Sequence, residues 1–140
     1  MDRKQTVSIY RNRKTGEFRI QPFGRLPNGS SQACGEPDRL PNTASNEQLL
    51  SSLIENLAKN EKQIYNEAMV PRIPPEERRR VFKEDQLVSV WHQESKYRII
   101  PFKRMGNSFG SIDDMIRVVS EGEFHNKGGE IIRSIFDEIL

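Results

Sequence analysis

Residues 18–25 read F-R-I-Q-P-F-G-R, and residues 97–104 read Y-R-I-I-P-F-K-R. A shorter match precedes each segment, since residues 7–10 read V-S-I-Y and residues 88–91 read V-S-V-W. Seven of the paired positions are identical, and Ile/Val, Tyr/Trp and Phe/Tyr replacements keep the chemistry at others. Alternating side-chain character of this kind is typical of half-buried strands. The sequence therefore predicts two β-hairpins that form an internal repeat.

Proline and glycine positions set the expected limits of these hairpins. A turn is predicted around Lys14, Thr15 and Gly16, between the two strands of the first hairpin. Pro22 and Pro101 are expected at a strand end or on a sheet edge, because proline has no N–H to donate to a neighbouring strand. Residues 114–120 are expected to form a further strand in the second copy.

Amphipathic runs follow each hairpin and predict helices. The apolar residues of the two runs have the same spacing, which gives one stripe at a 3.6-residue period: Leu49, Leu50, Leu53, Ile54 and Leu57 in the first, and Ile131, Ile132, Ile135, Phe136 and Ile139 in the second. Ser45 and Gln48 form a capping box for the first helix. The second helix is expected to begin at residues 126–129, and the Gly128-Gly129 pair is read as its loop junction.

These elements predict an α+β protein. We expect two pseudo-repeated units, each a β-hairpin with an amphipathic helix, that share one core of antiparallel sheet and helices. The whole chain, 1–140, is predicted to be a single domain with unit 1 at 1–60, a helical connector at 61–86 and unit 2 at 87–140. A helix should start in the connector at Pro74 and Pro75, and the first helix should extend through Ile64 and Tyr65.

Composition excludes several classes of function. The 140 residues include one cysteine and two histidines, and no CxxC, HxxxH or HExxH motif surrounds them, so we expect no metal and no cofactor. The nucleotide-binding motif GxGxxG, the P-loop and the hydrolase motif GxSxG are absent. No signal-peptide core or membrane-spanning run is found. We therefore expect a cytoplasmic protein that is not an enzyme.

Charge is unevenly distributed along the chain, although the formal net charge is only +2. Residues 1–60 and 87–110 are basic, whereas residues 111–140 are acidic. An acidic end is suited to docking a basic partner. The candidate partner-binding residues are the acidic residues of that end: Asp113, Asp114, Glu121, Glu123, Asp137 and Glu138.

A different function is suggested by the basic residues of the hairpins. Arginines alternate there with aromatic residues, a combination that single-strand nucleic-acid binders use for stacking and phosphate contacts. The residues that would form this face are Arg19, Arg25, Arg98, Arg104 and Trp91. A nucleic-acid-binding module is therefore the alternative hypothesis.

The two hairpins, the acidic run and the closing amphipathic helix together resemble the immunity proteins of bacterial contact-dependent growth inhibition systems. The resemblance rests on V-S-I-Y…F-R-I-Q-P-F in the first copy and V-S-V-W…Y-R-I-I-P-F in the second. It implies a cytoplasmic inhibitor that binds the C-terminal toxin domain of a partner adhesin, commonly a nuclease, in a stoichiometric complex. The implied partner is this cognate toxin domain, not nucleic acid or a membrane, and the free chain is expected to be a monomer or weak dimer.

Overall fold

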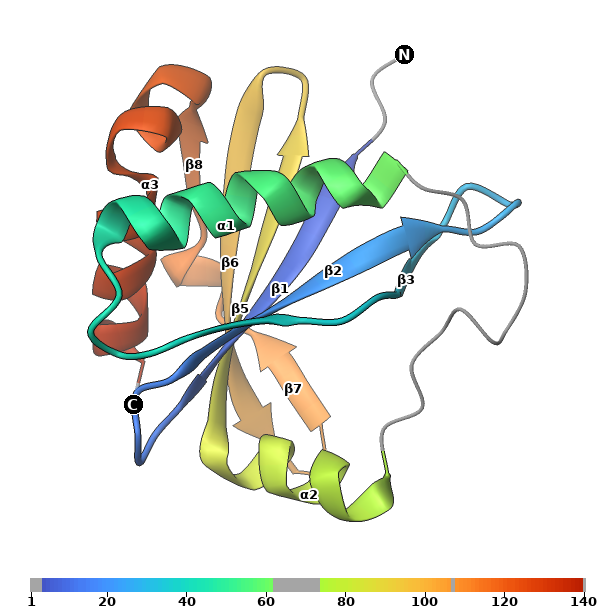
Figure 1. Ribbon diagram of the computed structural model, residues 1–140, viewed down its shortest axis with the longest axis vertical. Helices are drawn as coiled ribbons and strands as arrows, with labels where there is room; N and C mark the ends of the chain where they lie inside the picture. Colours follow the sequence, from blue (N-terminus) through green and yellow to red (C-terminus); the bar gives the residue numbers. More distant parts are fainter. Residues whose placement is uncertain (1–3, 62–73, 107, 140) are drawn as a thin grey trace.

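The computed structural model describes residues 4–61, 74–106 and 108–139 (Figure 1). Its strands are β1 (Gln5–Asn12), β2 (Phe18–Arg25), β3 (Ser31–Ala33), β4 (Asp38–Leu40), β5 (Asp85–Gln93), β6 (Lys96–Met105), β7 (Ser108–Ser111) and β8 (Arg117–Ser120). Its helices are α1 (Asn46–Ala58), α2 (Pro75–Glu84) and α3 (Glu121–Glu138), with short 3₁₀ turns η1 (Lys59–Glu61) and η3 (Asp113–Met115). The predicted α+β class is confirmed.

All eight strands form one antiparallel, curled sheet. Its order is β3-β2-β1-β5-β6-β7, with β4 also paired to β2 and β8 also paired to β6. The first strands of the two hairpins, β1 and β5, lie side by side at the centre, and Ser8 is the register partner of Ser89. Each half of the sheet therefore extends outward from this central pair, β2 on one side and β6 on the other.

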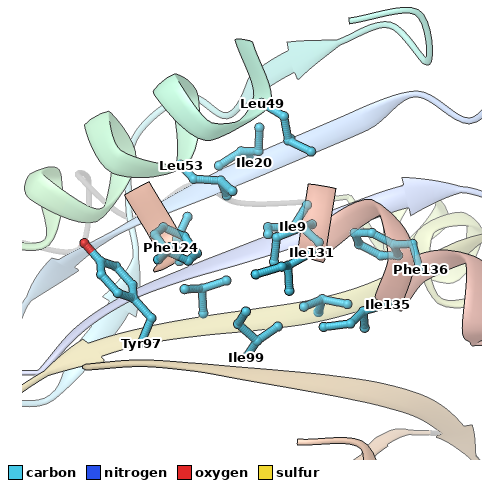
Figure 2. Packing of buried hydrophobic residues seen from close by; sticks show 14 of the residues in the cluster. Ile9, Ile20, Leu49, Leu53, Tyr97, Ile99, Phe124, Ile131, Ile135 and Phe136 are labelled. Carbon is cyan, nitrogen blue, oxygen red and sulfur yellow. The ribbon is translucent and has the colours of Figure 1, made fainter. Parts of the chain in front are cut away.

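The core lies between one face of the sheet and the helices α1 and α3 (Figure 1). Alternate residues of the four central strands enter it: Val7, Ile9, Phe18, Ile20, Val88, Val90, Tyr97 and Ile99. Leu49 and Leu53 of α1 and Phe124, Ile131 and Phe136 of α3 pack against them (Figure 2). Among the described residues, both helices and both hairpins contribute to this one apolar cluster.

The expected placement of the two prolines was wrong. Pro22 lies inside β2 opposite Val7, and Pro101 lies inside β6 opposite Val88. Each proline is tolerated because its strand changes outer neighbour there: β2 pairs with β4 before Pro22 and with β3 after it. Likewise, β6 pairs with β8 before Pro101 and with β7 after it.

The expected start of the last helix was also wrong. α3 begins at Glu121, because the Ser120 side chain accepts a hydrogen bond from the Glu123 N–H and caps it. The Gly128-Gly129 pair therefore lies within α3, where the helix crosses the start of α1. A Cβ atom on Gly129 would overlap the backbone carbonyl of Asn46. These glycines thus allow the two helices to approach closely.

The remaining local predictions agree with the structure in part. The capping box of Ser45 and Gln48 is formed, and α2 begins at Pro75 as expected. The expected strand at 114–120 is shorter, since η3 occupies its first residues and β8 the rest. The expected extension of the first helix through Ile64 and Tyr65 lies outside the described residues.

The close crossing of α1 and α3 can be tested with a matched pair of glycine substitutions in α3. Gly129→Ala should lower the free energy of unfolding by about 1–3 kcal/mol, because its methyl group must displace backbone. Gly122→Ala, in the same helix, meets nothing within 4 Å and should raise stability by up to about 1 kcal/mol. Urea titrations of both variants measure this difference. Equal stability of the two variants would contradict the role given to the crossing.

Candidate functional site

The six acidic candidates do not form one cluster. Glu121 and Glu123 lie in the first turn of α3, whereas Asp137 and Glu138 end the same helix. At 1.5 Å per residue, the two pairs are roughly 24 Å apart along the helix axis. The remaining two, Asp113 and Asp114, lie in η3, between β7 and β8.

Among the described residues, three of the six lie close to a basic side chain: Glu121 beside His92, and Glu123 and Asp137 in ion pairs with arginines. Glu121 Oε1 lies 2.9 Å from His92 Nε2, and Glu123 Oε1 lies 3.9 Å from Arg117 Nη2. Asp137 Oδ1 accepts a hydrogen bond of 2.8 Å from Arg11 Nη1. These carboxylates thus connect α3 to the sheet and to the segment that precedes it, although all three remain partly or fully accessible.

Asp113 and Asp114 are one of two adjacent pairs in the set; the other is Asp137 and Glu138, of which Asp137 is paired with Arg11. Both side chains of the first pair are exposed in the one turn of η3. The Ser111 hydroxyl donates a hydrogen bond of 2.7 Å to Asp113 Oδ1, which holds that carboxylate at the end of β7. Of the six candidates, these two therefore offer the most compact negative charge to a partner.

The arginine and aromatic candidates lie on the open face, which is the face of the sheet opposite α1 and α3. Arg98 is the register partner of Trp91 on this face. The guanidinium of Arg19 lies over the ring of Tyr10, at 4.5 Å, and the ammonium of Lys4 lies 3.8 Å from the centre of the Trp91 ring. Each of these cation–π pairs places a positively charged group next to the face of an aromatic ring.

Most of these arginines are already engaged by the chain. Arg25 is only 7% exposed, and it donates hydrogen bonds to the backbone oxygens of Gly29 and Lys4. Arg104 donates one to the Lys83 carbonyl oxygen. Arg19 Nη2 lies 3.8 Å from Asp85 Oδ2, and both side chains are nearly buried. The open face is thus basic, but only part of its charge is available to a ligand.

A hollow of about 860 Å³, which we call the sheet groove, lies on the open face. It lies between the first hairpin and α2, and its residues include Tyr10, Arg19, Phe23, Arg39, Arg79, Phe82 and Phe109. The rings of Phe82 and Phe109 meet edge to face at 5.0 Å and close one end. Aromatic walls with several arginines make this groove suited to an anionic or aromatic group.

Burial changes the titration of two groups beside the sheet groove. Burial raises the pKa of Asp85 above its usual value, although the Arg19 guanidinium and the Asn12 amide oppose this change. Burial also raises the pKa of Tyr10, and Asp85 contributes in the same direction while Arg19 opposes it. The carboxylate of Asp85 therefore lies in a site that favours its neutral form.

The sequence did not indicate the sheet groove itself. Tyr10, Arg19 and Phe23 lie on one face of the sheet, as the alternation of side chains along paired strands requires. Phe82 and Phe109 come from α2 and β7, and no local pattern pairs them. The sequence signal that could have indicated this contact is the presence of aromatic residues just before and just after the second hairpin.

The raised pKa of Asp85 predicts a pH-dependent stability. Folding favours the neutral carboxyl, so the stabilisation from this group is present below its unfolded pKa, 3.8, and is lost as pH rises through the folded value. Asp85→Asn removes the titration but keeps an oxygen for Asn12. The unfolding free energy of the natural chain minus that of Asp85→Asn should therefore decrease as the pH rises above 3.8 and through the raised folded pKa. A difference that stays constant or grows would contradict the burial argument.

Comparisons with known proteins give matches in structure alone. No family model matches the sequence, and no curated protein matches it. A protein of unknown function from Neisseria meningitidis has a TM-score of 0.74 at 15% identity, covering 98% of this chain and 96% of that chain. A chain of the CdiA-CT/CdiI toxin and immunity complex from Yersinia pseudotuberculosis has a TM-score of 0.70 at 13% identity over 98% of both chains, so the two share one fold.

No described helix could span a membrane.

Proposed function

We propose that this chain is an immunity protein that binds and neutralises the C-terminal toxin domain of a contact-dependent growth inhibition effector. One observation carries the proposal: the fold matches, over 98% of both chains, a chain from a toxin and immunity complex. The sequence resemblance described above supports the same assignment. Such a protein acts by forming a stoichiometric complex with the toxin domain, and it is located in the cytoplasm together with the toxin's target.

The contact surface is part of the proposal. Asp113 and Asp114 present two exposed carboxylates in one short turn, a local concentration of negative charge that would attract basic groups of the toxin. Glu121, Glu123, Asp137 and Glu138 would act as separate contacts because they are at the two ends of α3. Charges at the edge of an interface mainly speed association and select the partner.

Co-expression with the cognate toxin domain tests the proposal directly. We expect growth to be rescued and a 1:1 complex to be purified. Asp113→Lys with Asp114→Lys should weaken that complex by about tenfold or more, because each reversal replaces attraction by repulsion. Affinity is measured by calorimetry with the purified toxin domain.

The matched control is Glu17→Lys with Glu94→Lys, which makes the same change of net charge at exposed positions near the hairpin turns. This variant should keep the affinity of the natural chain. Absence of both rescue and complex would reject the immunity function. Equal losses in the two double variants would reject only the contact surface, since they would show an effect of net charge.

The alternative function, nucleic-acid binding, is favoured by one observation, the basic and aromatic lining of the sheet groove. Arg19 is nearly buried against Asp85, so its reversal would disturb the fold. Exposed Arg79 and Arg98 provide a cleaner test. If the open face binds single strands, Arg79→Glu with Arg98→Glu should abolish salt-dependent binding of a labelled oligonucleotide, measured by fluorescence anisotropy. No binding by the natural chain at low salt would reject this alternative.

A further inference from the structure

A second hollow lies in the helix layer, on the side of the sheet opposite the sheet groove. α1 and α3 cross where Gly129 faces the Asn46 backbone, and a groove of about 580 Å³ opens in the corner beside this crossing. We call it the helix groove. Its walls come from residues 46–55 of α1 and residues 125–130 of α3. It shares no residue with the sheet groove or with the six acidic candidates.

The floor of the helix groove is apolar. Leu50 packs against the core cluster but is only half-buried. Ile54, one turn further along α1, is 38% exposed and is one of the few large apolar side chains that the described residues leave accessible. An exposed aliphatic side chain that lies within a hollow is typical of a docking surface, because a partner can cover it completely.

The rim of the helix groove is acidic. Glu47 and Glu55 belong to α1, which has no basic residue, and Glu130 belongs to α3. Among the described residues, none of these three carboxylates is in an ion pair. The lining contains one lysine, Lys127, and one histidine, His125. Three unpaired carboxylates around an aliphatic floor are complementary to a segment with cations on both sides of one apolar side chain.

We infer that the helix groove docks a basic segment of a partner protein, with one aliphatic or aromatic anchor on Leu50 and Ile54 and with Lys or Arg side chains on Glu47, Glu55 and Glu130. This interaction goes beyond toxin neutralisation, because it uses a different surface of the molecule. The sheet groove, which is lined by several arginines, attracts the opposite charge. The chain thus presents two docking surfaces of opposite sign on its two layers.

The probe is a short fluorescein-labelled peptide with a single Phe between Lys and Arg residues, titrated with the full chain and followed by anisotropy. We expect saturable binding that Glu55→Lys with Glu130→Lys weakens by about tenfold or more. Ile54→Ser should weaken it several-fold without changing its dependence on salt, because it removes apolar contact and no charge. All three side chains are accessible, so circular dichroism should show unchanged folding.

Two controls separate docking from general charge attraction. Glu17→Lys with Glu94→Lys should bind the peptide as the natural chain does, and a peptide with Ala in place of Phe should bind the natural chain more weakly. Equal loss in both double variants, or no saturable binding, would overturn the inference. A concentration-dependent dimer that Ile54→Ser dissociates would also overturn it, since a second copy would then cover the groove. Toxin binding is expected to survive Glu55→Lys with Glu130→Lys, so this inference and the proposed function can fail separately.

Discussion

The antiparallel pairing of β1 with β5 is the interaction on which the rest of the structure depends. It brings together two hairpins that are far apart in sequence and aligns Val7 with Val90 and Ile9 with Val88, so that one apolar face is continuous across both halves. Only a continuous face is large enough for α1 and α3 to cover together. Two separate units of this size would each bury too little surface to be stable.

On each side of the sheet, the pairing of the outer strands changes at a proline. At Pro22 and Pro101 the outer neighbour of the strand changes, and the two short outer strands leave in different directions. α2 lies beside β7 (Figure 1), and residues of α2, β7 and the first hairpin together line the sheet groove. The helix layer forms the second groove through the close contact of Gly129 with Asn46. Both grooves thus lie where backbone constraints bring neighbouring elements together.

Local sequence patterns predicted the hairpins, the first helix cap and the shared core, because these depend on residues close in the chain. They failed where a distant contact decides the outcome. Gly128 and Gly129 read as a helix break, but their lack of a side chain serves the crossing with α1. The acidic candidates form a run in sequence, yet a helix of 18 residues separates its ends in space. Likewise, the contact of Phe82 with Phe109 joins elements that no periodicity relates.

The central position of β1 has a consequence for how the chain reaches this fold. Ser8 and Ser89 are register partners although 81 positions separate them, and closing a loop of that length costs about 2 kcal/mol more entropy than closing a hairpin turn. Contacts within a hairpin close a shorter loop than this pairing does, and during synthesis β1 has no β5 to pair with until residues 85–93 have been made. An open edge of eight residues is a template for any complementary strand. Pairing of this edge with the β5 of a second chain would give a domain-swapped dimer.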